Sequence, residues 1–598
     1  MAMNNSATKA GLSRRPAPGL DIFKTPENTT FYSANLYQSL NKSNQEIRLI
    51  EISTQTGDDG ILECKLLPAT LLTDARKQYL ALSYCAGDST DTKEILVNGV
   101  SCNIFANLHH ALTLARGYWI RSSEERPLRL WVDQLCINQH DLSERSHQVG
   151  FMREIYQSAE RTLACLSTSP TSGEGLKWFN DLCDAVTVPQ DNGSLQGNRE
   201  GRLGTKEETG LQGVLRGRRA KLVENFRLTH HWLFTDQQVR ILNYLLDRTG
   251  IDKFVNGWIA FFDLLNSPWW NRAWICQEFI VSGQVSFMFG HYSASWERCW
   301  EIAQDFCEIH RWLLMNWKFF LHTTGLPIDG PEARQLRHVH DIVQERDLHR
   351  QVDHVRNALG MKIRWSGSMD IKTLLSHSRS CKSSDDRDRV YAMLGLASPG
   401  YNIFPDYSDD LSAREVMIMT TRAIIEKEDS LGILAQATRL VQLKNLDVPS
   451  WVADWSSTEA ADMDFGENQA HSWSLMPHES PQCAFEAITD PNDQTQAYAL
   501  RVYGTFITRI KVGIKTWPDA DFNNAEGWFG NALISIADGD EVWILQGLRV
   551  PIILRPYHDG YRAVSCAFVA KRRPQDDSGT PLCIPEEARS NRRRIILY

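Results

Sequence analysis

The stretch Leu130–Leu166, LWVDQLCINQHDLSERSHQVGFMREIYQSAERTLACL, decides the fold class of this chain. It begins with an apolar run, continues through a polar turn into an amphipathic segment, and ends in a second apolar run. Strands that alternate with helices at this spacing are typical of an α/β sheet domain. The sequence therefore predicts an α/β fold with one strand that ends on Asp133 and another over Thr162–Leu166.

The first of these strands runs into polar residues that we interpret as a candidate ligand site. Asp133 follows the apolar run directly, and Asn138–Asp141 come a few residues later. In open α/β sheets, ligands gather beyond the carboxyl ends of the strands. A carboxylate at the end of an apolar strand needs a hydrogen-bond partner or a ligand, so Asp133 is either a loop anchor or part of a site.

Two neighbours of Asp133 have a structural explanation. Asp141 and Glu144 have the spacing of a capping box, in which Asp141 accepts from the first-turn amides and Glu144 reaches back to the amide of Asp141. Cys136 lies between Leu135 and Ile137, so we interpret it as a buried thiol rather than as the nucleophile of a cysteine hydrolase.

The segments around this stretch extend the same alternation. Tyr79–Tyr84 is predicted to be a strand, and Glu94–Phe105 is predicted to be a hairpin that turns at Asn98-Gly99. From Pro170 to about Arg219 the chain is rich in Gly, Ser, Asn and charge and no apolar period survives, which indicates a long insertion or linker. Ordered structure is predicted again from Trp258–Ser282 onward.

Composition excludes several classes of protein. The 598 residues are 42% hydrophobic and 23% charged, which fits about two to four globular domains. The net charge of −9 provides no global attraction to nucleic acid, and the 19 tryptophans are not accompanied by a basic stripe. No apolar run reaches the roughly 18 residues that span a bilayer, so we expect no nucleic-acid partner and no membrane segment.

The cysteines and the termini indicate the compartment. The N-terminus lacks the apolar core of a secretory signal, and the 13 cysteines are odd in number and form no CxxC pair. Reduced thiols of this kind are typical of an intracellular protein, so we predict a cytoplasmic or nuclear location. Lys571–Arg573 and Arg592–Arg594 are interpreted either as a nuclear signal or as solvated tails.

Motifs for metals and nucleotides are missing from the sequence. Four histidines in one region lack the paired i, i+4 spacing of a helical metal site and are interpreted as part of a solvated helix; they are His338, His340, His349 and His354. No P-loop and no strand-linked GxGxxG occurs, which argues against an NTPase or a Rossmann cofactor domain. We therefore expect no metal site and no resident cofactor.

Three blocks of this sequence together resemble the fungal heterokaryon-incompatibility (HET) domain family. The family pattern joins an Ala-Leu-Ser-Tyr strand with a glycine turn, a Trp-x-Asp-x-x-Cys-Ile-Asn-Gln block, and a Trp-x-Arg-x-Trp-x-x-Gln-Glu block. The first block is here Ala81–Tyr84 with Gly87. The second is Trp131–Gln139, followed by Glu144, Arg145, Gln148, Val149, Met152, Ile155 and Tyr156. The third consists of Trp270, Arg272, Trp274, Gln277 and Glu278. Later motifs extend the resemblance to most of the chain after residue 45: Asp386–Leu396, Pro405–Tyr407, Pro449–Trp455 and Gly539–Arg555.

The chain departs from the family pattern at two places. Ala86 stands where the family usually carries a tryptophan before the first glycine, and Cys165–Ser167 replaces the usual Trp-Leu-Gly. The first departure removes an aromatic wall from the candidate site.

HET domains are in turn similar to Toll/interleukin-receptor (TIR) domains, whose flavodoxin-like sheet hydrolyses NAD in some members. The resemblance implies an α/β fold with a TIR/flavodoxin-like parallel sheet and a long insertion, followed by a mixed α+β C-terminal region. The predicted organisation is a disordered tail over 1–45, a TIR-like HET domain over 46–290 with an insertion at about 170–257, a helical region over 291–400, a HET-associated α+β region over 401–570, and a basic tail over 571–598.

The same resemblance implies a site. Glu278 is the candidate catalytic residue, because a carboxylate stabilises the oxocarbenium character that develops when the nicotinamide–ribose bond breaks. Trp274, one helical turn earlier, is placed to stack on a nicotinamide or adenine ring. The candidate ligand-binding residues are Ser83, Tyr84, Gly87, Asp88, Asp133, Arg272 and Trp274. NAD would be a substrate and not a cofactor.

An alternative needs no site at all. Trp270, Trp274 and Val281 have near-helical spacing and would be core, Gln277 and Glu278 would be a polar flank, and Arg272 would pair with an acid.

The biological role that the resemblance implies is non-self recognition and regulated cell death in a filamentous fungus. Two mechanisms stay open: an NAD glycohydrolase, and a non-enzymatic adaptor that assembles through TIR-like surfaces. The implied partners are proteins of an incompatibility pathway, with homo-oligomerisation as an option.

Overall fold

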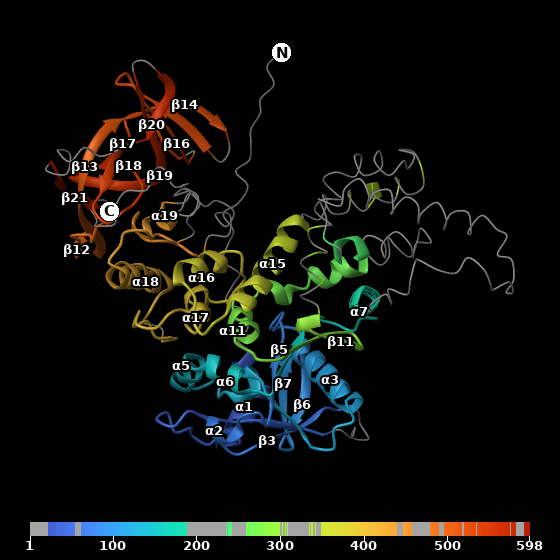
Figure 1. The fold of residues 1–598 in the computed structure, drawn as a ribbon. Helices are drawn as coiled ribbons and strands as arrows, with labels where there is room; N and C mark the ends of the chain where they lie inside the picture. The colour runs from blue at the N-terminus through green and yellow to red at the C-terminus, as the bar shows by residue number, and fades with distance from the viewer. Residues whose placement is uncertain are drawn as a thin grey trace, which may run out of the picture. The chain divides into compact units, whose positions relative to one another are not determined.

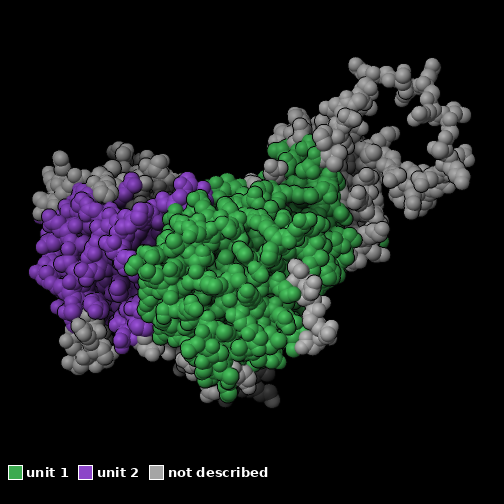
Figure 2. All heavy atoms as spheres, turned by 90° about the horizontal axis from the view of Figure 1, so that it is seen from below, with its two compact units in different colours: residues 1–270, 278–364 green, residues 271–277, 365–598 purple. Residues whose placement is uncertain are grey.

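The computed structural model describes most of the chain as two compact units (Figure 2). Unit 1 comprises Met1–Trp270 and Glu278–Arg364, and unit 2 comprises Asn271–Gln277 and Trp365–Tyr598. The described residues are 22–53, 61–187, 259–298, 348–408, 410–438, 446–456, 479–489, 496–516, 519–533, 535–573, 576–581 and 591–598, with isolated positions between 235 and 341.

Unit 1 is built on a nine-stranded mixed sheet with the order β11-β10-β9-β5-β8-β2-β3-β6-β7 (Figure 1). The strands are β2 (Ile50–Ile52), β3 (Glu63–Leu66), β5 (Leu80–Ser83), β6 (Thr92–Val97), β7 (Val100–Phe105), β8 (Leu128–Trp131), β9 (Arg161–Cys165), β10 (Val285–Phe289) and β11 (Tyr292–Ser295). Its central strands β10, β9, β5 and β8 are mutually parallel. Every residue of β5 and of β10 is buried, as expected of parallel strands that are covered on both faces.

Helices precede, connect and follow these strands. Their bounds are α1 (Pro26–Ser33), α2 (Leu72–Ala75), α3 (Ala106–Arg121), α4 (Asp133–Cys136), α5 (Leu142–Gly150), α6 (Met152–Ser158), α7 (Glu174–Thr187) and α15 (Leu348–Arg364), with the 3-10 helix η2 (Pro268–Asn271). The short helix α11 (Ile275–Ile280) carries the chain from unit 2 into unit 1, because its residues up to Gln277 belong to unit 2. In Figure 1, α3 runs beside β6 and β7.

Several predictions for this unit are confirmed. The Leu130–Leu166 stretch contains the last two residues of β8, then α4 to α6, then β9, although β8 ends at Trp131 and not on Asp133 as expected. The hairpin turns at Asn98 and Gly99, whose φ angles of 51° and 78° match a type I′ turn. The sheet is mixed, however, and not parallel throughout as expected, because β2, β3, β7 and β11 add antiparallel pairs.

Three expectations about irregular segments are wrong in part. Within the expected tail over 1–45, α1 packs on β7 through Asn28, whose side chain exchanges two 2.8 Å hydrogen bonds with the backbone of Asn103. After Pro170, α7 is an amphipathic helix that buries Leu176, Phe179 and Leu182. In the rest of the expected insertion, residues 188–234, 236 and 242–257 lie outside the described residues, and residues 237–241 are helical.

The expected basic tail over 571–598 also contains strands. Lys571–Arg573 ends β19 (Gly560–Arg573), and β21 (Arg593–Leu597) pairs with β13 (Gln496–Arg509). The aliphatic residues Ile595 and Leu597 are buried in this pairing, which explains why the segment joins the sheet.

Unit 2 combines helices with a ten-stranded, largely antiparallel sheet, which confirms the expected mixed C-terminal region. The helices are α16 (Ile371–Ser378), α17 (Asp388–Leu394), α18 (Ala413–Glu428) and α19 (Leu434–Ala437). The further strands are β12 (Ala484–Thr489), β14 (Lys511–Thr516), β15 (Asp519–Asn523), β16 (Trp528–Leu533), β17 (Glu541–Leu545), β18 (Ile552–Tyr557) and β20 (Asp576–Pro581). Phe522, Val542, Ile553 and Val569 lie in the core of this sheet.

The C-terminal sequence motifs hold this unit together. Asp540 is buried and accepts two hydrogen bonds from Arg555, at 2.8 and 2.9 Å. The Tyr407 hydroxyl donates to the carboxylate of Asp388 in α17 at 2.6 Å. These residues therefore have structural partners within unit 2. Among the described residues, none of the helices combines the length and the apolar character that a membrane crossing requires.

Candidate functional site

The centre of the candidate site is a chain of hydrogen bonds at the carboxyl end of β5. The Ser83 hydroxyl donates to Glu278 Oε2 and accepts from Trp269 Nε1, the latter over 2.7 Å. All three side chains are buried, with exposed fractions of 1% for Ser83, 2% for Glu278 and 0% for Trp269. The structure thus brings together two residues that we predicted for the site and a tryptophan that we did not single out.

Glu278 is held in place by hydrogen bonds between α11 and β9. The Ser282 hydroxyl donates to the Glu278 carbonyl over 2.6 Å, and Thr162 Oγ1 lies 2.7 Å from Ser282 Oγ. On the other side, the Ser267 hydroxyl donates to the carbonyl of Leu166 and accepts from the amide of Trp269. The backbone that carries Trp269 is therefore tied to Leu166, just past the carboxyl end of β9, whereas the backbone that carries Glu278 is tied to Thr162, near the start of that strand.

A buried lysine closes the C-terminal end of α11. Lys362 Nζ donates to the carbonyls of Phe279 and Ser282, over 2.8 and 2.7 Å. Cations at this end of a helix satisfy its last carbonyls and interact favourably with the helix dipole. Burial lowers the pKa of Lys362 to about 8.

Aromatic rings surround this end of the sheet. Trp269 packs edge-on against Phe279 and Phe287, with ring centroids 6.1 and 5.9 Å apart. Phe279 also packs on Trp296, and Lys362 Nζ lies 4.8 Å from the centroid of the Trp296 ring. The carboxylate of Glu278 is itself removed from water, with 2% exposure, which strengthens its electrostatic interactions.

Burial limits what Glu278 can reach. A carboxylate with 2% exposure contacts a ligand only after the side chains over it move. Its Ser83 partner fixes the orientation of one oxygen, which is useful for a group that must face a developing positive charge. The earlier alternative, in which Gln277 and Glu278 form a polar flank, is wrong, because both side chains are buried.

The loop after β5 carries three further candidates. The Tyr84 hydroxyl is buried and lies 3.5 Å from Gln134 Oε1. Gly87 has a φ of +88°, a backbone conformation that favours glycine, and a Cβ there would displace the side chain of Asn107. Asp88 is exposed and accepts from the amide and the hydroxyl of Thr90, which lowers the pKa of its carboxyl.

Asp133 has local hydrogen-bond partners. It begins α4, and its Oδ1 accepts from the amide of Gln134 over 2.8 Å. Its carbonyl accepts from Gln139 Nε2, also over 2.8 Å. These bonds support the loop-anchor interpretation, and the ligand-binding role of Asp133 stays a prediction.

The expected capping box is half correct. Asp141 accepts from the amides of Ser143 and Glu144, as predicted. Glu144 does not reach back to Asp141: its carboxylate is buried and takes hydrogen bonds from Arg48, at 2.6 and 3.1 Å, and from the Asn138 amide. Glu144 therefore anchors the loop after β8 to the N-terminal part of the chain.

The thiol of Cys136 is buried, as predicted. Its exposed fraction is 0%, and burial raises its pKa to about 12. A thiol with this pKa carries almost no thiolate at neutral pH, which argues against a nucleophilic role.

The remaining candidates belong to unit 2. The backbones of Arg272 and Lys382 form an isolated parallel β-bridge. Trp274 is half-buried. Gln277 Nε2 donates to the carbonyls of Tyr391 and Ala392. Gln277 is thus an anchor for α17 rather than part of the Glu278 centre. The structure brings Ser83 and Glu278 together, whereas Arg272 and Trp274 lie in the other compact unit.

Sequence reasoning missed or misplaced three side chains around this centre. Trp269 was overlooked beside the motif residue Trp270, and Lys362 carried no signal because a lone lysine in a charged helix is ordinarily solvated. His354 was placed on a solvated helix, which is wrong: it is buried, and its Nε2 lies 2.7 Å from the carbonyl of Trp270.

Two comparisons with known proteins found a similar sequence. Residues 79–278 match the family model described as heterokaryon incompatibility protein (HET), a segment that opens one residue before β5 and closes on Glu278. Heterokaryon incompatibility protein 6, OR allele, from Neurospora crassa is 26% identical over 465 residues, which are 72% of this chain and 61% of that relative. This chain therefore spans less than two thirds of the relative's length. No solved structure matches the chain.

Proposed function

We propose that this chain, whose residues 79–278 match the heterokaryon incompatibility family model, acts in fungal non-self recognition and regulated cell death by hydrolysing NAD. Glu278 is the proposed catalytic carboxylate, and Ser83 is its positioning residue. The observation that carries this proposal is the hydrogen bond that joins them at the end of a central parallel strand.

The strand order supports a TIR-like interpretation. In sequence order, the four parallel strands β5, β8, β9 and β10 lie in the spatial order 2-1-3-4, which is the start of the flavodoxin-like order 2-1-3-4-5. In such sheets the ligand site lies at the switch point between the first and third strands. Here these are β5, which ends at Ser83, the partner of Glu278, and β9, to whose carboxyl end the backbone of Trp269 is tied through Ser267.

The chemistry suits a buried carboxylate. As nicotinamide leaves, positive charge develops on the ribose, and a carboxylate in an apolar environment stabilises that charge more than one in water does. Water then adds to the ribose carbon, so that the products are nicotinamide and ADP-ribose. Binding of NAD must displace side chains over Glu278, so the active state differs from the closed arrangement of this structure.

A second candidate function is favoured by the same burial. If Glu278 only ties α11 to β5, the domain is a non-enzymatic adaptor that recruits an executioner through its surface. In that case the carboxylate has no contact with a ligand, and its 2% exposure is its permanent state.

Nicotinamide release from NAD separates the two functions. The purified full chain is incubated with NAD, and nicotinamide is measured for the wild type, for Glu278→Gln and for Glu154→Gln, which alters a half-buried glutamate of α6 as a control. We expect release by the wild type and by the control, and a loss of about a hundredfold or more for Glu278→Gln. Equal release by all three, or none by the wild type together with intact death signalling, contradicts the enzymatic proposal.

A further inference from the structure

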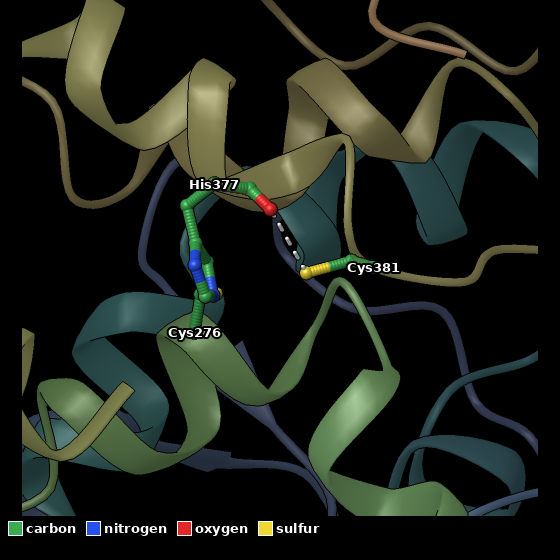
Figure 3. Close-up of side chains that lie close together, drawn as sticks. All are labelled: Cys276, His377 and Cys381. Carbon is green, nitrogen blue, oxygen red and sulfur yellow. Dashed lines mark hydrogen bonds between the residues drawn. The ribbon is translucent and has the colours of Figure 1, made fainter. Parts of the chain in front are cut away.

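Three side chains with soft donor atoms converge within unit 2 (Figure 3). Cys276 comes from α11, His377 from the last turn of α16, and Cys381 from the loop that follows. Their ligand atoms, two sulfurs and an imidazole nitrogen, all lie within 4.8 Å of one another. In Figure 3 the ring of His377 points toward Cys276, and the sulfur of Cys381 lies beside the His377 carbonyl.

The donor set selects the metal. Thiolates and imidazole suit zinc, whereas calcium and magnesium take oxygen ligands. With Zn–S bonds of about 2.3 Å and Zn–N bonds of about 2.0–2.1 Å, donors around a tetrahedral zinc lie about 3.5 Å apart. The present separations, all within 4.8 Å, exceed that geometry by at most about 1.3 Å, a difference that rotations of the side chains close.

The backbone that carries the three donors is already fixed. The backbones of Arg272 and Lys382 form a parallel β-bridge, in which the Ala273 amide donates to the Lys382 carbonyl over 3.1 Å. Arg389 donates to the carbonyls of Ser378 and Cys381, over 3.1 and 2.7 Å. Because the backbone around the three donors is already ordered, metal binding costs little conformational entropy.

We propose that Cys276, His377 and Cys381 bind one zinc ion, with a water molecule as the fourth ligand. Binding converts two thiols to thiolates and releases two protons to the solvent, and the two negative charges balance those of the ion. The thiols are buried, with exposed fractions of 2% for Cys276 and 0% for Cys381, so charge balance is a requirement for any cation there.

The consequence is a cross-link between the segment Asn271–Gln277 and α16. Gln277 already holds this segment to α17, and the next residue along the chain is Glu278. The proposed metal therefore fixes the segment that leads to the candidate catalytic residue, independently of whether that residue hydrolyses NAD. We expected no metal site because CxxC pairs are absent, and the first donor is far upstream of the other two.

Metal content tests this inference directly. The full chain is purified without chelator, and zinc is measured by mass spectrometry for the wild type, Cys276→Ser, Cys381→Ser and His377→Gln. We expect about one zinc per chain in the wild type and less than a tenth of that in Cys276→Ser and Cys381→Ser. Cys566→Ser is the control, because Cys566 is an equally buried thiol of the same unit outside the cluster, and it should keep its zinc.

Cobalt replacement gives a second readout that does not depend on activity. Cobalt bound by two thiolates absorbs in the near ultraviolet through sulfur-to-metal charge transfer, and this band should be present in the wild type and in Cys566→Ser. His377→Gln alters a half-buried side chain, so it tests the site even if the cysteine variants fail to fold; its visible cobalt bands should shift or disappear. A wild type that binds neither metal, or a disulfide between Cys276 and Cys381 in freshly purified protein, overturns the proposal.

Discussion

The Ser83 hydroxyl donates a hydrogen bond to the carboxylate of Glu278 and so joins two sequence motifs that are 195 residues apart. Both side chains are buried, and Ser83 also accepts from Trp269. The bond therefore connects β5 with α11, the helix in which the matched segment ends.

Replacing Ser83 by alanine should destabilise the protein. The change removes a hydrogen bond to a buried charged group, which contributes about 1.5–3 kcal/mol, and leaves the Trp269 donor without this acceptor. We expect a lower denaturant midpoint, with a smaller effect from Ser378→Ala, where an equally buried hydroxyl donates only to a carbonyl of its own helix. Equal decreases of the denaturant midpoint in the two variants would show that the Ser83–Glu278 hydrogen bond contributes no more to stability than the bond made by Ser378.

The buried pair of Arg48 and Glu144 provides a second stability test. Arg48→Met leaves the Glu144 carboxylate buried without its cation, a loss that typically costs 3–5 kcal/mol. The exposed pair Arg129–Glu51 is the control, because its partners are 42% and 28% exposed and such pairs contribute about 0–1 kcal/mol. Chemical denaturation of Arg48→Met and Arg129→Met measures both effects. A difference below about 1 kcal/mol between them argues against an anchoring role for Glu144.

Lys362 predicts a dependence of stability on pH. Burial lowers its pKa from the usual 10.5 to about 8. Between these values the unfolded chain binds more protons than the folded chain, so the contribution of Lys362 to stability rises as the pH rises from 8 to 10.5. Below pH 8 its ammonium is charged in both states, and the cost of burying that charge is constant.

The variant Lys362→Met isolates this contribution. The melting temperature of the wild type should rise relative to that of Lys362→Met as the pH increases from 8 to 10. Lys65→Met, at an exposed position of β3, should show no such trend relative to the wild type. If the melting-temperature differences of Lys362→Met and Lys65→Met from the wild type change with pH in the same way, Lys362 does not titrate between pH 8 and 10.

Asp133 can be assigned by a nearly isosteric change. In Asp133→Asn the amide oxygen can still accept from the Gln134 amide, so a loop anchor should keep its melting temperature and its NAD hydrolysis within about twofold of the wild type. A normal melting temperature with lost hydrolysis would instead place the carboxylate against a ligand.

Local patterns were predicted better than long-range pairings. The strand expected over Tyr79–Tyr84 is observed at Leu80–Ser83, because a short apolar run between polar residues specifies a buried strand. The cap at Asp141 is likewise a local interaction. Glu144 differs, since its partner Arg48 lies 96 residues away, and no local spacing reveals which cation reaches a given carboxylate.

The mixed sheet and the site illustrate the same limit. The strands β2 and β3 have only three and four residues, too few for a clear alternation, so their antiparallel pairing was not expected. Ser83 and Glu278 were chosen through the family resemblance, and their contact required the fold. Trp269 was missed because a buried tryptophan in an apolar region is ordinarily core, and only its bond to Ser83 distinguishes it.

The proposed function makes its sharpest prediction in cells. Overexpressed wild type should lower cellular NAD and arrest growth, whereas Glu278→Gln should accumulate to the same level and do neither, because a neutral amide does not stabilise a developing ribosyl cation. Glu154→Gln should behave as the wild type does. Cellular NAD, protein abundance and growth are measured in parallel, so that a failure to fold is distinguished from a loss of chemistry. If Glu278→Gln still arrests growth while NAD stays constant in every strain, the carboxylate is a structural tie between α11 and β5, and the adaptor function replaces the enzymatic one.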